Sequence, residues 1–414
     1  MVWGASSIML HKYCLFCLTI IASLSGLFVV SVDGAIFGRD DEGQHQISEE
    51  LFGSLEELAR IVDVSYCVGT TEVRKPFECL SRCSEFQGFE LVTTWNTGPF
   101  LSDSCGYIAL SHEPSPKRII VAFRGTYSIA NTIIDLSAYP QAYVPYHPEN
   151  GKESALLQCL NCTVHAGFLT SWSNTRAIVL KHVSAARARY PDYDLILVGH
   201  SLGGAVAALA GVEMQLRGWD PQVTTFGEPR IGNKALVGFL DRIFDLDGLR
   251  EGKGADARDP RFRRVTHVND PVPLLPLQEW GYEMHAGEIF IAKAELPPLP
   301  HDIKICQGDS DARCIAGTDE AVGLMLKEFD DIILDKQPLS KRVESPHQAV
   351  LKDGNSDSSA NAVVADHKQP QTPFSLPWHL ISSRYRLWEL FFAHRDYFWR
   401  LGLCVPGGDP TGKR

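Results

Sequence analysis

Long runs of Lys or Arg are absent from this 414-residue sequence, whose formal net charge at pH 7 is -11. A protein that binds nucleic acid through its phosphates needs a basic surface, so this charge balance argues against a nucleic-acid partner. No internal repeat is evident either. The length, with 44% hydrophobic residues, indicates one large domain with extensions.

Charged residues are also missing from a long N-terminal segment. The residues from Tyr13 to Val32 are apolar except for uncharged Thr and Ser, and His11 and Lys12 precede them. This pattern predicts a secretory signal peptide over residues 1–34, with an uncleaved signal anchor that tethers the protein to a membrane as the alternative. The polar, acidic residues 35–50 are interpreted as a mobile leader. A signal peptide and a signal anchor both export the body of the protein. The signal peptide, once removed, predicts a secreted protein.

The cysteines lack a zinc-binding pattern. The short pairs have no second C-x-x-C or H-x-x-H partner, and an exported protein meets an oxidising compartment, so disulfides are preferred to a metal site. Cysteines that are close in the sequence are predicted to form disulfides that close local loops. Two distant cysteines remain, and a disulfide between them would join the two ends of the body. The proposed pairs are Cys79–Cys83, Cys159–Cys162, Cys306–Cys314 and Cys67–Cys404. Cys105 is then the unpaired thiol.

Asn161 begins the tripeptide Asn161-Cys162-Thr163, which is a sequon for N-glycosylation. A disulfide at Cys162 competes with its use. Asn161 is therefore a glycosylation candidate.

Strand-like and helical patterns alternate along the body of the chain, residues 51–404. Apolar residues at helical spacing predict a helix from about Glu49 to Val62, and a second helical pattern covers Ser171 to Tyr190. Short apolar runs predict strands, and their alternation with helices is typical of a mostly parallel α/β sheet. The expected strands cover residues 89–94, 107–111, 118–126, 195–198, 222–226, 262–268 and 288–292.

Residues 335–372 differ in composition from the rest of the body. They are rich in Lys, Ser, Asp, Gln, Asn and Pro and poor in aromatic residues, which predicts a disordered surface insertion. Lys341-Arg342 inside it resembles a dibasic processing site, although two solvated basic residues are the simpler interpretation. Residues 405–414 are expected to form a flexible tail.

The most informative stretch is Gly199-His-Ser-Leu-Gly203, which matches the pattern G-x-S-x-G. This pattern is typical of a sharp turn between a strand and a helix that holds a serine hydroxyl clear of the sheet edge. The apolar run Leu195 to Val198 and the alanine-rich run Ala205 to Leu216 supply such a strand and helix. Ser201 is therefore a candidate nucleophile.

A nucleophilic serine needs a base and an acid that orients the base, and in α/β hydrolases both follow the serine in the chain. Asp270 is the preferred acid because it follows the strand ending at Val268 and precedes a proline-rich segment. Residues alone leave two candidate bases, His394 in a dense aromatic segment and His285. The other aspartates considered are Asp220, Asp241, Asp245, Asp247, Asp256 and Asp259.

Six motifs in the same order resemble the fungal-type triacylglycerol lipases, lipase class 3. They are Phe123-Arg-Gly-Thr126, His165-Ala-Gly-Phe168, Gly199-His-Ser-Leu-Gly-Gly204, Thr225-Phe-Gly-Glu-Pro-Arg-Ile-Gly-Asn233, Thr266-His-Val-Asn-Asp-Pro-Val-Pro273 and Ala393-His-Arg-Asp-Tyr-Phe398. The resemblance spans about residues 51–404 apart from the insertion. It implies an α/β-hydrolase fold, with a mostly parallel central sheet flanked by helices and a short helical lid.

The resemblance also implies roles for individual residues. The catalytic triad would be Ser201, Asp270 and His394, and the oxyanion hole would consist of the backbone N–H groups of Thr126 and Leu202. His285 matches a family position that is not catalytic. The pairs Cys67–Cys404, Cys79–Cys83 and Cys159–Cys162 resemble family disulfides.

The segment Ser128 to Leu136 corresponds to the family's lid. Ile129, Ile133 and Leu136 would share one face of a short helix, which could cover the serine in water and meet lipid at an interface. The aromatic residue often found in family lids is replaced here by Thr132.

These observations predict a secreted serine ester hydrolase, a lipase that acts on acylglycerols at an oil-water or membrane surface. A feruloyl or other soluble carboxylesterase and a phospholipase on the same fold are the alternatives, followed by a non-catalytic lipid-binding homologue. The proposed chemistry calls for no metal and no organic cofactor. No obligate protein partner is evident.

Overall fold

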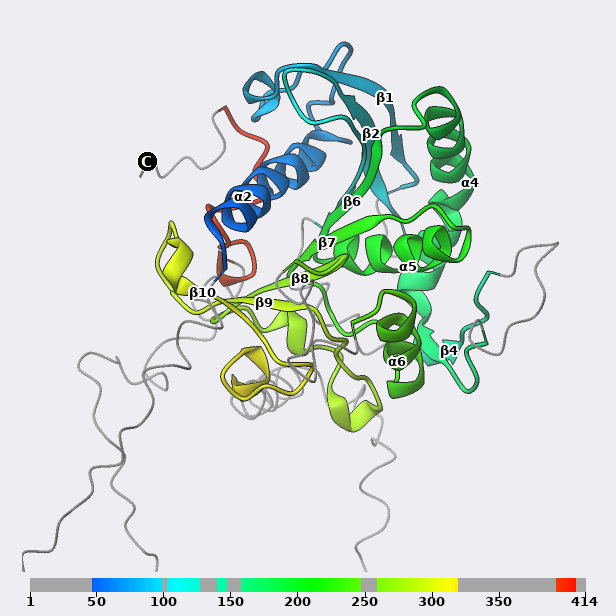
Figure 1. Cartoon of the computed structure of the whole chain (residues 1–414), viewed down its shortest axis with the longest axis vertical. Helices are drawn as coiled ribbons and strands as arrows, with labels where there is room; N and C mark the ends of the chain where they lie inside the picture. Colours follow the sequence, from blue (N-terminus) through cyan, green and yellow to red (C-terminus); the bar gives the residue numbers. More distant parts are fainter. Residues whose placement is uncertain are drawn as a thin grey trace, which may run out of the picture. The chain divides into compact units, whose positions relative to one another are not determined.

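One eight-stranded sheet organises the described part of the computed structural model, residues 47–98, 103–126, 140–146, 158–246, 259–318 and 392–406 (Figure 1). These residues belong to one compact unit, His45–Arg414. Several predicted segments lie outside the described residues: the signal segment 1–34, nearly all of the leader, the lid segment 128–136, the insertion 335–372 with Lys341-Arg342, and most of the tail.

The sheet has a parallel centre and antiparallel edges. Its strand order is β1-β2-β3-β6-β7-β8-β9-β10, and the neighbours from β3 to β9 pair in parallel. The strands are β1 (Phe89–Asn96), β2 (Cys105–Ser111), β3 (Arg118–Arg124), β6 (Asp194–His200), β7 (Gln222–Phe226), β8 (Phe262–His267), β9 (Glu288–Ile291) and β10 (Ile303–Ile305). The predicted mostly parallel sheet is therefore present. A two-stranded sheet pairs β4 (Pro140–Ala142) with β5 (Thr163–His165).

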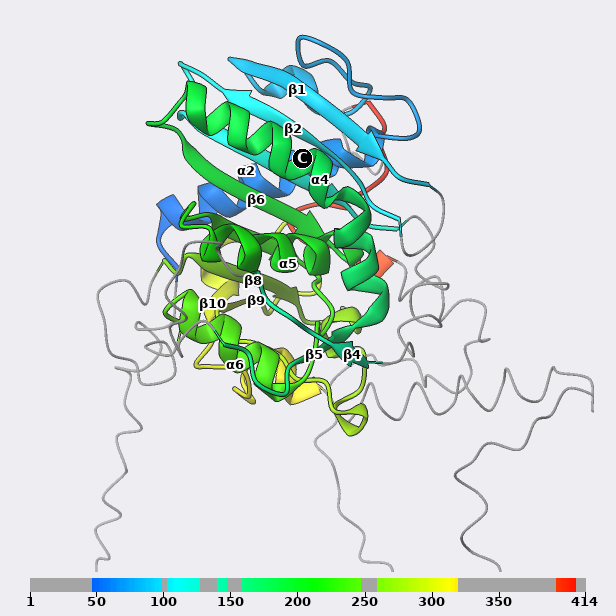
Figure 2. The same cartoon turned by 90° about the vertical axis from the view of Figure 1, so that its right-hand side faces the viewer.

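Helices cover both faces of the large sheet. Figure 1 shows α2 (Glu49–Val64) on one face and α4 (Ala166–Arg189), α5 (Leu202–Leu216) and α6 (Lys234–Ile243) on the other, and Figure 2 shows α4 and α5 across the strands. Ile119 and Val121 of β3 pack in the cluster that contains α4 and α5, whereas Ile120 packs in the cluster that contains α2. Because both faces are covered, the central strands are continuous apolar runs.

Single-turn 3₁₀ helices complete the described structure: Ser65–Cys67, Cys83–Glu85, Val272–Leu274, Gln278–Trp280, Pro300–Asp302 and Ile315–Thr318. No helix among the described residues combines the length and the apolar character that a bilayer-spanning helix requires.

The helix predicted from Glu49 begins at that residue and extends two residues beyond Val62. Its first turn is capped by Ser48, whose hydroxyl oxygen accepts a hydrogen bond from the backbone N–H of Leu51 at 3.1 Å. The last predicted leader residues therefore belong to the cap and first turn of α2. Helix α2 leads directly into the turn that contains Cys67.

Four disulfides join the cysteine pairs that the sequence proposes: Cys67–Cys404, Cys79–Cys83, Cys159–Cys162 and Cys306–Cys314. Cys105 is free and buried. Within the described residues, Glu288 groups with Cys306 and Cys314 at metal-ligand spacing. The two sulfurs are bonded to each other, so they are not available as thiolate ligands.

Candidate active site

Ser201 lies on the sharp turn between β6 and α5. Its backbone has φ 59° and ψ -129°, a conformation that non-glycine residues rarely adopt. A Cβ atom at Gly199 would overlap the carbonyl group of Gly203, and one at Gly203 would overlap the backbone of Phe123 and Arg124. The two glycines of the motif are therefore required by close backbone packing, and the turn holds Ser201 at the carboxyl end of a central strand.

Asp270 and His394 form a buried pair at the same edge of the sheet. The Nδ1 atom of His394 lies 2.9 Å from both carboxylate oxygens of Asp270, and neither side chain is exposed to solvent. A carboxylate accepts hydrogen bonds, so Nδ1 of His394 carries a proton and donates it to Asp270. In the neutral form of the ring, Nε2 is the proton acceptor.

Two more groups hold the Asp270 carboxylate in place. The backbone N–H of Val272 donates to Oδ1 at 2.9 Å, and the hydroxyl of Tyr397 donates to Oδ2 at 2.5 Å. Tyr397 was not assigned a role from the sequence, although it lies three residues after His394 in the motif Ala393-His-Arg-Asp-Tyr-Phe398. Because Tyr397 lies in the same short motif as His394, the sequence already places it near the Asp270 carboxylate.

Two buried atoms of this site lack a partner. Ser201 Oγ and His394 Nε2 have no hydrogen-bond partner among the described residues. Burying a polar atom without a hydrogen-bond partner costs free energy. An unpaired hydroxyl and an unpaired ring nitrogen in one site therefore indicate a catalytic role rather than a structural one.

The end of β3 lies against the serine. A Cβ atom at Gly125 would lie 2.8 Å from the Cβ of Ser201, so the backbone that leads into Thr126 passes close to the serine. Leu202 is the first residue of α5, where backbone N–H groups have no acceptor within the helix. The two segments from which the oxyanion donors are expected therefore both adjoin Ser201.

His200, the residue before the serine, contacts the segment that carries His394. Its Nε2 atom lies 2.8 Å from the backbone oxygen of His394 and must donate the hydrogen bond, so its Nδ1 accepts one from the Tyr66 hydroxyl at 2.5 Å. Burial, followed by the charges of His394 and Arg395, lowers the pKa of His200 well below its usual range. His200 is therefore a neutral bridge between the serine turn and the C-terminal segment.

Comparison with known proteins gives the family. The class 3 lipase family matches residues 120–280. The chain is 48% identical over 386 residues to the secreted mono- and diacylglycerol lipase 2 of Gibberella zeae, which covers 88% of this chain and 85% of that protein. The chain belongs to the class 3 lipase family. It is similarly related to lipase A of Sodiomyces alcalophilus, with 48% identity over 388 residues and the same coverage of both chains.

A solved structure agrees with this assignment. The crystal structure of the Lip2 lipase from Yarrowia lipolytica aligns with a TM-score of 0.58 and 32% identity, and covers 68% of this chain and 92% of that one. The predicted resemblance and the α/β-hydrolase fold are confirmed. The protein is a lipase, and therefore a carboxylic ester hydrolase.

The other candidate residues of this lipase lie elsewhere. His285 is buried with its Nε2 3.2 Å from Glu228 and its Nδ1 2.7 Å from the backbone oxygen of Ala286. Asp241 accepts a hydrogen bond from the backbone N–H of Ala286 at 3.0 Å. Asp220 and Asp259 are largely exposed and pair with Arg261 and Arg263. Asp245 is exposed, and Asp247 and Asp256 are not among the described residues.

Proposed function

We propose that this lipase hydrolyses mono- and diacylglycerols with Ser201, His394 and Asp270 as its catalytic triad. The observation that carries the proposal is the buried Asp270–His394 pair, which leaves Nε2 of His394 as a proton acceptor. Ser201 Oγ, on the strained turn of the same sheet edge, has no hydrogen-bond partner among the described residues. An acyl-transfer site needs this combination of a presented hydroxyl and an oriented imidazole.

The reaction follows from these three side chains. His394 takes the proton of Ser201 through Nε2 as Oγ attacks the ester carbonyl carbon, and the charge of Asp270 stabilises the imidazolium that forms. The imidazolium then protonates the leaving alcohol. His394 then takes a proton from water as the water oxygen attacks the acyl carbonyl carbon, and the imidazolium returns that proton to Ser201 Oγ as the bond to the fatty acid breaks. Side chains account for every proton, so the steps call for no metal or organic cofactor.

The oxyanion of each tetrahedral intermediate would be held by the backbone N–H groups of Thr126 and Leu202. The close approach of Gly125 to Ser201 and the position of Leu202 at the start of α5 support this assignment. One such donor is typically worth about 3 kcal/mol of transition-state stabilisation.

The substrate class rests on relatives and on the lid. The Gibberella zeae relative is named a mono- and diacylglycerol lipase, and it shares 48% identity over most of both chains. In the lid segment, Ile129, Ile133 and Leu136 would give an apolar helix face suited to an oil-water or membrane surface. A soluble-ester hydrolase and a phospholipase are the alternative outcomes of the substrate test.

We further propose that the protein is secreted after removal of the signal peptide over residues 1–34. The Gibberella zeae relative is named a secreted lipase, and the four disulfides fit an oxidising compartment. The N-terminal residue of protein recovered from culture medium tests this proposal. A product that stays with the membrane fraction and retains residues 1–34 would support the anchor instead.

The triad is tested with Ser201→Ala, which removes the nucleophile and should lower ester hydrolysis by about a thousandfold or more without unfolding the protein. Retained activity in purified protein would overturn the assignment. The substrate is tested with emulsified mono-, di- and trioleoylglycerol, phosphatidylcholine vesicles and the soluble ester methyl ferulate. We expect the highest rates on mono- and dioleoylglycerol, and preference for the ferulate or the phospholipid would support the corresponding alternative.

A further inference from the structure

The segment that carries His394, residues 392–406, must be held to the body of the domain. A disulfide joins Cys404 to Cys67, which follows the end of α2. His394 lies well before Cys404 in the chain, and a crosslink at one residue does not fix a side chain several residues away. The turn between the two must be held by other contacts.

Arg395, the neighbour of His394, links the two ends of this turn through hydrogen bonds to residues 401 and 402. Its guanidinium donates to the backbone oxygens of Leu401 at 3.1 Å and Gly402 at 2.6 Å, and its own backbone oxygen accepts from the N–H of Leu401 at 2.8 Å. Arg395 is 2% exposed, so its charge is shielded from water. The position of His394 is thereby coupled to that of Gly402.

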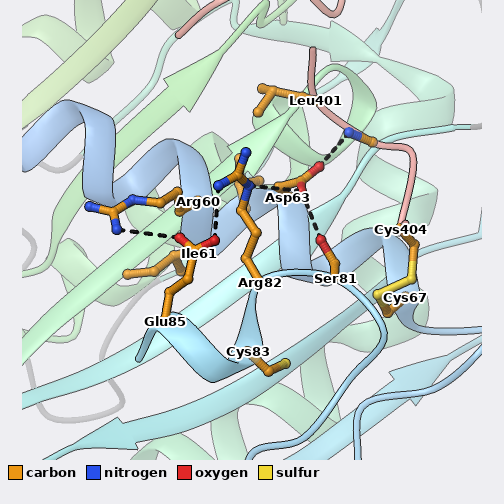
Figure 3. Close-up of polar contacts among 12 residues, drawn as sticks. Arg60, Ile61, Asp63, Cys67, Ser81, Arg82, Cys83, Glu85, Leu401 and Cys404 are labelled. Atoms are coloured by element: carbon orange, nitrogen blue, oxygen red, sulfur yellow. Dashed lines mark hydrogen bonds and ion pairs between the residues drawn. A yellow bond between two sulfur atoms is a disulfide. The ribbon is translucent and has the colours of Figure 1, made fainter. Parts of the chain in front are cut away.

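Asp63, near the end of α2, holds this turn from the body of the domain. The backbone N–H of Gly402 donates to Oδ1 of Asp63 at 2.6 Å, and the Ser81 hydroxyl donates to Oδ2 at 3.0 Å. Nε of Arg82 lies 3.8 Å from the same Oδ2. Figure 3 shows Asp63 between the loop that carries Ser81 and Arg82 and the chain next to Leu401. One buried carboxylate therefore joins α2, this loop and the C-terminal segment.

The contacts continue from this turn to the active site. Gly402 has φ 82°, and a Cβ atom there would overlap the guanidinium of Arg395 and touch the ring of Tyr66. The Arg395 guanidinium lies 5.4 Å from the centre of that ring. Tyr66 bonds to His200, and His200 donates to the backbone oxygen of His394. The network that starts at Asp63 thus returns to the backbone of His394.

We propose that Asp63 is a positioning residue for the base His394 and acts through Gly402 and Arg395. This inference rests on the proposed role of His394. Its physical reason is that a general base must be held within a small fraction of an ångström of its productive geometry, and small displacements cost large factors in rate.

Burial and the neighbouring polar groups act in opposite directions on the charge of Asp63. Burial raises the pKa of the Asp63 carboxyl, although Gly402, Ser81, Arg82 and Arg395 each lower it. The fold therefore disfavours the ionised carboxylate relative to water. The ionised carboxylate attracts both arginines and accepts the N–H of Gly402, so the charge of Asp63 contributes to holding the turn.

The test compares Asp63→Ala and Asp63→Asn with the matched variants Asp241→Ala and Asp241→Asn. Asp241 is also buried and also accepts a backbone N–H, but that N–H belongs to Ala286. We expect kcat to fall about tenfold in D63A and about threefold in D63N, which keeps an oxygen acceptor, with KM within about twofold. The Asp241 variants should keep kcat.

The rate at which a serine-reactive phosphonate labels Ser201 gives a second readout, which should fall in parallel with kcat in the Asp63 variants. A kcat or labelling rate within about twofold of the matched Asp241 variant would overturn the proposal, as would a change confined to KM. If D63A does not fold, D63N decides the question by the same comparison with D241N. A wild-type protein that hydrolyses ester but is not labelled would overturn the serine triad itself, and the role of Asp63 with it.

Discussion

The Tyr397 hydroxyl donates a 2.5 Å hydrogen bond to the same Asp270 carboxylate that His394 contacts. Burial and the adjacent Asp270 raise the pKa of the Tyr397 phenol well above its usual range, so the hydroxyl stays protonated and donates. The acid of the proposed triad is therefore oriented from two sides by residues three positions apart on one segment.

Removing this hydroxyl should affect both stability and turnover. We expect Tyr397→Phe to lower the free energy of unfolding by about 2 kcal/mol, because a hydrogen bond to a buried carboxylate is lost, and to lower kcat by about threefold to tenfold. Tyr107→Phe is the matched control, since its buried hydroxyl donates to the backbone oxygen of Ile61 at 2.8 Å. The Tyr107→Phe control should lose stability and keep the kcat of the wild type. Equal kcat values for the two variants, measured on one ester substrate, would contradict an orienting role for Tyr397.

His200 makes the fold sensitive to acid. The pKa of His200 is lowered in the folded protein by burial, so the folded state keeps this imidazole neutral below pH 6.5 whereas the unfolded chain takes up a proton. Its contribution to stability is therefore lost as pH falls from 6.5 toward the folded pKa. We expect His200→Gln to reduce the pH dependence of the unfolding free energy between pH 6.5 and 5.5 by up to about 1.4 kcal/mol. Urea unfolding of the wild type and of His200→Gln at these two pH values measures the difference. An equal change in the unfolding free energy of both proteins would contradict the prediction.

Substitutions of His285 and His394 should have different effects, because only His394 is the proposed base. His394→Ala should lower kcat by about a thousandfold or more, because the proposed base is lost. His285→Gln removes the imidazole that contacts the buried Glu228, so we expect a stability loss of about 1–3 kcal/mol and an unchanged kcat. Thermal unfolding and initial rates on one ester provide both measurements. A catalytic loss in the folded His285 variant that matches the His394 variant would reverse the assignment.

The Asn161 side chain is exposed and lies directly before β5, next to the Cys159–Cys162 disulfide. We expect protein secreted from a eukaryotic host to lose mass on treatment with an N-glycosidase. Asn161→Gln and Thr163→Ala should show no loss, whereas Thr163→Ser should keep it, because serine preserves the sequon. Mass spectrometry of the four proteins tests this, and an unmodified wild-type chain would refute the prediction.

Local patterns in the sequence were sufficient for most strands and for three helices. The run Gln222–Phe226 has the predicted bounds, and α2 begins at the predicted residue, because apolar spacing and a capping serine act within a few residues. Helix α6 was not predicted, although Asn233 caps it by accepting from the N–H of Leu236 at 3.1 Å. Strand β10 has three residues and exists through its pairing with β9, which no local pattern reports.

The sequence by itself determined the turn at Ser201, because glycines, strand and helix are all local to it. It also proposed the four disulfides from their spacing. It did not choose between His394 and His285 until the ordered motifs of a family were considered. Tertiary structure brings His394 to Asp270 and Gly402 to Asp63. The hydrogen bond between Gly402 and Asp63 joins residues 339 positions apart. Such contacts depend on how α2, the sheet and the C-terminal segment pack together, and packing between distant segments leaves no periodic trace in the chain.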